Sequence, residues 1–279
     1  MQRTTVVGLV LATCLASAAI AETRKEYRFT VGPKANVSVD TQYGAITVKP
    51  GGPSQVIVVA VLQSDKVEVD HSQKGSRVEI ESHLLSGADR QSGRVDYEVT
   101  IPPDANVNLH STTGPLTAER LRGDLTFEGA AAPVEVRNVS NGHVHIKTIS
   151  GPITLTALHA AHVEITSISG DVHLNSVTGP LVQVNSGSGK IFFDGDFGSG
   201  GDYNFMTSTG DIEALVPASA SADFRAHSMH GQVQKDFPLE PEQHIRTSEI
   251  GSSFFGTVGK AASRVVFRSL GGKIRLKLR

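Results

Sequence analysis

The sequence predicts an all-β protein, a right-handed parallel β-helix with an antiparallel β cap at its N-terminal end. Three observations predict this fold. From position 107 onward, glycines recur at short and nearly even intervals, or close to multiples of one such interval. Alternating apolar and polar residues follow each glycine, which is the pattern of a strand. The chain also lacks a sustained helical pattern with caps. Two β-sandwich domains are the alternative fold.

Residues 1–21 form the first expected element, a secretory signal peptide. One Arg near the start precedes an apolar run that ends in an Ala-Ile-Ala triplet, the layout of a cleavage site. We therefore expect export and cleavage between Ala21 and Glu22, with the mature protein in the periplasm, at the cell surface or secreted. The run is short for the ~20 residues of a membrane span. A lipoprotein anchored at Cys14 is the less favoured alternative, because the run continues past that residue.

Composition excludes several classes of site. Cys14 is the only cysteine, so a mature chain cleaved at Ala21 has no disulfide, thiolate metal site or cysteine nucleophile. The formal net charge of −2 gives no global field for nucleic acid. Aromatic residues make up only 5% and Trp is absent. We therefore expect a core of stacked aliphatic side chains.

Residues 22–106 are the second expected element, an N-terminal β cap region. Alternating strands here are longer, as in "SQVIVVAVLQ" and "RVDYEVTIPP", and turn-rich loops join them. An open solenoid end would pair with other chains, so a cap is expected.

Residues 107–279 are the third expected element, a β-solenoid of units of ~10 residues, each a corner and a short strand. The glycines expected to open the strands at positive φ are Gly114, Gly123, Gly142, Gly151, Gly170, Gly179, Gly189, Gly210, Gly231 and Gly271. "GHVHIKTISGPI" begins at Gly142 and its echo "GDVHLNSVTGPL" at Gly170, an offset of about three units, which favours coils of three strands over a flatter two-sided coil. His145 would then lie above His173, and Gly151-Pro152 above Gly179-Pro180. The final "GGKIRLKLR" predicts a charged edge strand that prevents further coils or chains from stacking on this end.

The order of these segments resembles that of the bacterial putative adhesin family. The matching pieces are "RFTVGPKANVSVDTQYGAITV", "RVDYEVTIPPDANVNLHSTTGPL", "TISGPITL", "SISGDVHL" and "TSTGDIEALVP". They extend over essentially the whole mature chain. The resemblance implies an exported β-solenoid domain of unassigned function, and it brings no catalytic residues.

Histidines offer the first candidate metal site. If His145 lies above His173, the two imidazoles could bind Zn²⁺ or Cu²⁺ with His143 or Asp171 nearby. Metal sites need three or four converging ligands, whereas side chains on a straight ladder diverge. An outward polar face is therefore the favoured interpretation.

The loop "FFDGDFGSGGDYNF" offers the second candidate metal site. Asp194, Asp196 and Asp202 could supply oxygen ligands to Ca²⁺. Calcium-binding repeats of β-helices occur in tandem, and this segment stands alone, which favours an ordinary insertion loop. We expect no cofactor.

These observations favour a non-enzymatic, adhesin-like binding or scaffold protein of the bacterial cell envelope. Its expected partners are an envelope polysaccharide, an anionic lipid or another envelope protein, without nucleic acid or a span in the mature chain. A polysaccharide-active β-helix lyase or hydrolase is the alternative. It would need paired carboxylates in a groove, whereas the acids of this chain are scattered singly.

Overall fold

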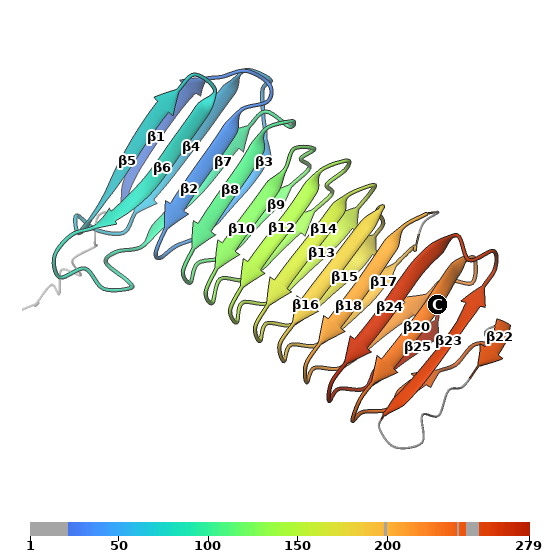
Figure 1. Cartoon of the computed structure of the whole chain (residues 1–279). Coiled ribbons are helices and arrows are strands. Elements are labelled where there is room, and N and C mark those ends of the chain that lie inside the picture. Colours follow the sequence, from blue (N-terminus) through green and yellow to red (C-terminus); the bar gives the residue numbers. More distant parts are fainter. Residues whose placement is uncertain (1–21, 198–199, 239, 244–250) are drawn as a thin grey trace, which may run out of the picture.

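The computed structural model describes residues 22–197, 200–238, 240–243 and 251–279. The expected signal peptide and Cys14 lie outside this part of the chain. The described residues form strands, turns and loops without a helix, so the all-β prediction is confirmed. Two long sheets face each other along the whole molecule (Figure 1).

Within the described residues, sheet A has 12 strands and sheet B has 13. In spatial order, sheet A contains β1 (Thr23–Thr30), β4 (Gln55–Leu62), β7 (Val95–Ile101), β3 (Ile46–Pro50), β9 (Leu116–Glu119), β11 (Val134–Arg137), β13 (Ile153–Leu158), β15 (Val172–Val177), β17 (Ile191–Gly195), β19 (Ile212–Val216), β25 (Ile274–Leu278) and β21 (Val233–Lys235). Sheet B contains β22 (Glu240–Gln243), β23 (Ser252–Val258), β20 (Ala222–Ser228), β24 (Ser263–Ser269), β18 (Asp202–Thr207), β16 (Leu181–Ser186), β14 (His162–Ser167), β12 (His143–Thr148), β10 (Leu125–Gly129), β8 (Asn106–Ser111), β2 (Asn36–Thr41), β6 (Arg77–Leu84) and β5 (Val67–Lys74).

The middle of the molecule is a two-sided solenoid. From β8 to β19 the chain alternates between the sheets, and each strand pairs in parallel with the equivalent strand of the next coil. Val144 of β12 pairs with Val163 of β14, so one coil runs from the first of these residues to the second. The solenoid prediction is therefore confirmed, whereas the expected three-sided coil is wrong. The offset from Gly142 to Gly170 is about one and a half coils, so the two echoing segments lie on opposite sheets.

The corners after the sheet B strands share a hydrogen-bonding pattern. A buried Ser or Thr ends most of these strands, and its hydroxyl accepts the N–H of a glycine three positions later, as in Ser167–Gly170 (2.9 Å). A Cβ atom on Gly170 would lie 2.1 Å from the carbonyl oxygen of Gly151 in the preceding coil. None of the glycines that were expected at positive φ has a positive φ in the described structure. The glycines are therefore needed for close backbone stacking, and the expectation of positive φ was wrong.

Antiparallel strands close both ends. At the N-terminal end β4 pairs antiparallel with β1 and β7, and β5 pairs antiparallel with β6, as in the expected cap. In the same expected cap region, however, β2 pairs in parallel with β6 and β8, and β3 with β7 and β9, as in the solenoid. At the other end β23 pairs antiparallel with β20 and β22.

Each end also contains one coil that lies out of chain order. Strands β2 and β3 lie between β6–β7 and β8–β9, and β24 and β25 lie between β18–β19 and β20–β21. In Figure 1 the red strand β24 is visible between β18 and β20. Strand β25 is thus an interior strand and not the edge strand expected from "GGKIRLKLR". Lys277 of this strand pairs with Glu213 of the neighbouring β19 (2.8 Å), and Arg279, which follows the strand, pairs with Asp194 of β17, two strands away (2.6 Å).

A single hydrophobic core fills the space between the sheets. Inward positions of successive coils are aliphatic, as in the row Val144, Val163 and Val182. Phenylalanines gather toward the C-terminal end, where Phe205 of β18 stacks on Phe267 of β24 with centroids 5.1 Å apart. The alternation of the sequence therefore places one face of each strand in the core and presents the other outward.

Candidate functional site

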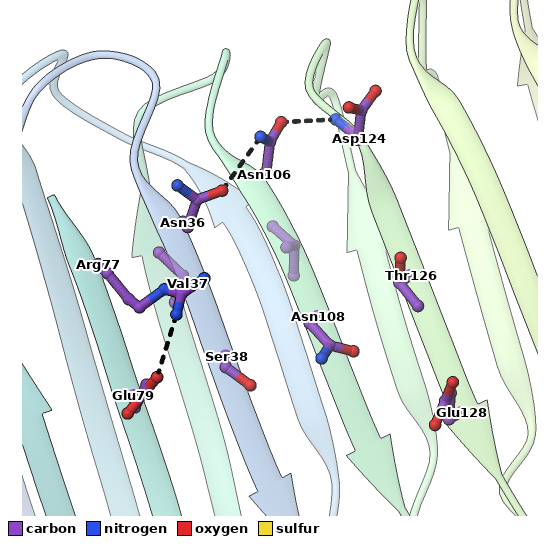
Figure 2. Close-up of a pocket in the computed structure, with 11 residues that line it drawn as sticks. Asn36, Val37, Ser38, Arg77, Glu79, Asn106, Asn108, Asp124, Thr126 and Glu128 are labelled. Carbon is purple, nitrogen blue, oxygen red and sulfur yellow. Dashed lines mark hydrogen bonds and ion pairs between the residues drawn. The ribbon is translucent and has the colours of Figure 1, made fainter.

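The best-defined candidate site is a polar hollow of about 450 Å³ on the outward face of sheet B (Figure 2). It crosses β6, β2, β8 and β10. We call it the polar hollow, and its polar lining is Asn36, Ser38, Arg77, Glu79, Asn106, Asn108, Asp124, Thr126 and Glu128.

Three small polar residues form a row across the hollow. Ser38 pairs in register with Asn108, and Asn108 pairs with Thr126, so they occupy equivalent positions ~4.8 Å apart. Their side chains hydrogen-bond to no other described residue. The row is therefore available to hydrogen-bond a ligand along the axis of the solenoid.

A second row at the rim is held by hydrogen bonds between coils. Asn106 Nδ2 donates to Asn36 Oδ1 (3.2 Å), and its own Oδ1 accepts the backbone N–H of Asp124 (3.0 Å). Asp124 Oδ1 in turn accepts the backbone N–H of His143 (3.3 Å). These bonds, two of which Figure 2 shows, fix the rim of the hollow.

Charged groups flank the two rows. Glu79 accepts a hydrogen bond from Ser72 (3.1 Å) and lies 4.0 Å from Arg77. At the nearby corner Arg122 donates two hydrogen bonds to Asp104, at 2.8 and 2.9 Å. The Arg122 guanidinium thereby holds the pKa of Asp104 below its ordinary value. This ion pair joins the corner before β8 to the corner before β10.

Two of the candidate histidines lie on the same face, beyond the hollow. The ring of His143 stacks on that of His162, with centroids 4.5 Å apart, and His145 Nδ1 lies 3.3 Å from Glu164. His173 lies in β15 on the opposite sheet, next to Phe192. The predicted stacking of His145 on His173 was therefore wrong, because the next coil places Glu164 beside His145. Among the described residues, no cluster of three or more His, Cys, Asp and Glu side chains could hold a metal ion.

The three aspartates of the candidate calcium site lie on different elements. Asp194 lies in sheet A and pairs with Arg279, while Asp202 lies in sheet B, 3.8 Å from Arg264. Asp196 lies between these strands, and its backbone carbonyl accepts the Tyr203 hydroxyl (3.1 Å). Residues 198–199 of this loop lie outside the described residues.

The polar hollow was not predictable from the sequence, because it depends on the register between strands that are distant in the chain. The outward polar positions of "NVSVD" and "NVNLH" were visible. That these segments are neighbours follows only from the placement of β2 between β6 and β8.

Comparison with known proteins gave a family match and distant structural similarity. The Toastrack DUF4097 family profile matches residues 35–265, more than half of the chain. One similar solved structure is a putative cell adhesion protein from Clostridium sporogenes ATCC 15579, with 14% identity and a TM-score of 0.28 over 92% of this chain and 100% of that one. Another is a putative adhesin from Parabacteroides distasonis ATCC 8503, with 13% identity and a TM-score of 0.35 over 92% of this chain and 97% of that one. The search of curated proteins found no match. No helix in the described part of the chain is long and apolar enough to cross a membrane.

Proposed function

Because the chain belongs to the Toastrack DUF4097 family, in agreement with the resemblance seen in its sequence, we propose that it is an exported, adhesin-like recognition module of the cell envelope. Its ligand is a segment of a hydroxyl-rich polysaccharide, and its binding surface is the polar hollow. It acts by binding, without catalysis.

One observation carries this proposal. The row Ser38, Asn108 and Thr126 presents hydroxyl and amide groups that have no hydrogen-bond partner among the described residues, at a regular spacing along the axis. Such groups donate to and accept from the hydroxyls of a sugar chain. The rim residues Asn36, Asn106 and Asp124 are already held by hydrogen bonds, so those that touch a polymer lose little side-chain freedom on binding.

The experiment is thermal unfolding of the purified protein in the presence of a polymer panel. The panel contains neutral and acidic polysaccharides, lipopolysaccharide and peptidoglycan fragments. A polymer that binds only the folded state raises the midpoint of unfolding. We expect at least one polysaccharide to do so, and the double variant Asn108→Ala/Thr126→Val to remove the shift.

Thr154→Val is the matched control, because Thr154 occupies an outward position of sheet A. It should leave the shift unchanged. A panel without any shift, or a shift that persists in the double variant, would overturn the assignment of the polar hollow.

A further inference from the structure

Four large apolar side chains share one position of the repeated corner. The described residues include six exposed large apolar side chains, and four of them directly follow the buried Ser or Thr that ends a sheet B strand. These four, here called the apolar ridge, are Ile149, Ile168, Leu270 and Met229, with exposed fractions of 52%, 60%, 47% and 39%. Apolar groups exposed along one line indicate an interaction surface.

Backbone hydrogen bonds stack the corners in a continuous order. Ser169 N–H donates to Ile149 O (2.8 Å), which places Ile149 and Ile168 on adjacent corners. His230 N–H donates to Leu270 O (2.9 Å), which does the same for Leu270 and Met229. Gly187 and Ser208 occupy the two corners in between. At ~4.8 Å per coil the ridge is about 24 Å long. In Figure 1 these corners form part of the row beyond the arrowheads of sheet B.

Exposed cations line both sides of the ridge. On the sheet B side, Lys147 and Arg268 lie two positions before Ile149 and Leu270. On the sheet A side, Lys190 and Lys273 directly follow corner glycines.

The acids nearest these lysines are partly engaged by the backbone. Asp171 Oδ1 accepts the backbone N–H of Lys190, and Asp211 Oδ1 accepts that of Lys273, both at 2.8 Å. The edge therefore combines apolar side chains with an excess of basic ones.

A second hollow, of about 440 Å³, lies next to the C-terminal part of the ridge. Val266 and Phe255 form part of its lining, and Arg225 and Arg268 flank it. Val266 is 4% exposed, although its register position is on the outward face of sheet B. Asp223 also lines this hollow and pairs with Arg225 (3.2 Å). The hollow therefore places apolar surface beside Arg268, which is one of the cations of the ridge.

We propose that the apolar ridge is a lipid-contact edge, on which the protein lies with its long axis parallel to an anionic phospholipid bilayer. Ile149, Ile168, Leu270 and Met229 enter the boundary between headgroups and acyl chains, and the flanking Lys and Arg side chains contact the phosphates. Apolar side chains that insert beside basic residues that face the lipid headgroups are the combination by which proteins bind such surfaces.

The dimensions of the ridge favour a bilayer over a protein partner. A stable protein interface buries about 800 Å² on each side, whereas the ridge is one side chain wide at each corner. A bilayer adapts to a narrow edge, and it needs no matching surface.

The test is flotation of the purified protein with two kinds of vesicle, phosphatidylcholine alone and phosphatidylcholine mixed with phosphatidylglycerol. We expect binding to the anionic vesicles only. Ile149→Ser/Ile168→Ser should lower the bound fraction by about tenfold. Leu85→Ser is the matched control, because Leu85 is exposed (37%) but lies outside the ridge, and it should bind like the unchanged protein.

A fluorescent reporter gives a second readout. The chain contains no Trp, so Ile168→Trp introduces a single one at the ridge. We expect a blue-shifted emission that brominated acyl chains quench, whereas Leu85→Trp should show neither effect. Absence of binding to anionic vesicles, or full binding by the double Ser variant, would overturn the proposal. A dimer that forms without lipid and is lost in the double Ser variant would also overturn it, since the ridge would then serve a second copy. These outcomes are independent of the polar hollow, which lies on the face of sheet B.

Discussion

At the scale of single residues, the corner glycines are the positions that the fold tolerates changing least. Gly151, Gly170 and Gly189 lie in successive coils, and a Cβ atom on Gly170 or Gly189 would lie 2.1 Å from a backbone carbonyl oxygen of the preceding coil. Backbone atoms in a stacked coil cannot move aside as a flexible side chain can. Glycine is therefore required here because the space between coils leaves no room for a Cβ atom.

We expect Gly170→Ala to lower the free energy of unfolding by about 3 kcal/mol, since the added methyl group forces two coils apart. Gly52→Ala is the control, because a Cβ atom there would meet nothing within 4 Å. Urea denaturation of both variants measures the difference. Equal stability of the two variants would show that the coils separate without penalty.

The opposite corner holds strained residues. Ala160 has a φ of 51°, and the equivalent residue of the preceding coil is Asn141 at 58°. A left-handed conformation costs a β-carbon-bearing residue about 1 kcal/mol, which glycine avoids. We therefore expect Ala160→Gly to raise the free energy of unfolding by about 1 kcal/mol. Ala130→Gly, at a corner position without positive φ, should lower it. Thermal unfolding compares the two, and a destabilised Ala160→Gly would contradict this account.

The Asp104–Arg122 pair gives a pH-dependent prediction. Because the folded-state pKa of Asp104 lies below the ordinary value of 3.8, its contribution to stability is present above that value and is lost as the pH falls. We expect Arg122→Gln to raise the pKa of Asp104 toward 3.8, as followed by NMR titration of the carboxyl carbon. Arg120→Gln, which removes the partner of Glu119, should leave the titration of Asp104 unchanged.

At the scale of elements, the out-of-order coil β24–β25 holds the C-terminal end together. Strand β24 pairs in parallel with β18 on one side and β20 on the other. Its inward Phe267 stacks on Phe205. The coils at this end therefore depend on one inserted pair of strands.

We expect Phe267→Ala to lower the free energy of unfolding by about 4 kcal/mol. Hydrogen exchange should become faster in β18 and β20 together, while β12 and β14 stay protected. Phe192→Ala, at an outward position of sheet A, is the control. Loss of protection in β20 alone would show that β24 does not couple the two strands.

Individual strands were predictable from the sequence, whereas their stacking was not. Alternation identified β12, β13, β14 and β15, since each buries one face. The predicted number of strands per coil was wrong because the corners at both ends of the strands contain glycine in similar local sequences. Ser176-Val177-Thr178-Gly179 has the same pattern as Ser167-Ile168-Ser169-Gly170, yet Ser176 has a positive φ and the N–H of Gly179 bonds to Tyr203. Local sequence cannot separate the two corners, because the difference lies in which strand stacks against them.

The predicted histidine stacking was wrong for the same reason, because it depended on which strands stack against each other. His145 and His173 have similar local sequence, but they lie on opposite sheets and cannot share a ligand. Asn108 and Thr126 are one coil apart, but Ser38 is far from both in sequence and becomes their neighbour only through the inserted strand β2.

At the scale of the whole molecule, the proposed binding surfaces are on different sides. The polar hollow lies on the face of sheet B toward the N-terminal end, and the apolar ridge follows a corner edge toward the C-terminal end. A molecule lying on that edge would hold the face of sheet B at a steep angle to the bilayer surface. Both ligands could therefore be bound at once.

This arrangement predicts additive behaviour. We expect a polysaccharide that raises the unfolding midpoint to do so equally in the presence and absence of anionic vesicles. Calorimetric titration of the polymer with and without vesicles measures the coupling. A dissociation constant that changes by more than about threefold would show that the surfaces interfere.

The displaced coil at the C-terminal end also has a consequence in time. A chain that emerges from its N-terminus onward can stack its middle coils as each one appears. Strands β20 and β21 appear before the pair that separates them from β18 and β19, so they cannot dock until residues 263–278 have arrived. Completion of the fold is thus an insertion between two waiting coils and not one more addition to a growing stack. During that wait the open strands of β18 and β19 can accept the same segment from another chain, and the speed of this last step decides whether molecules finish separately or linked.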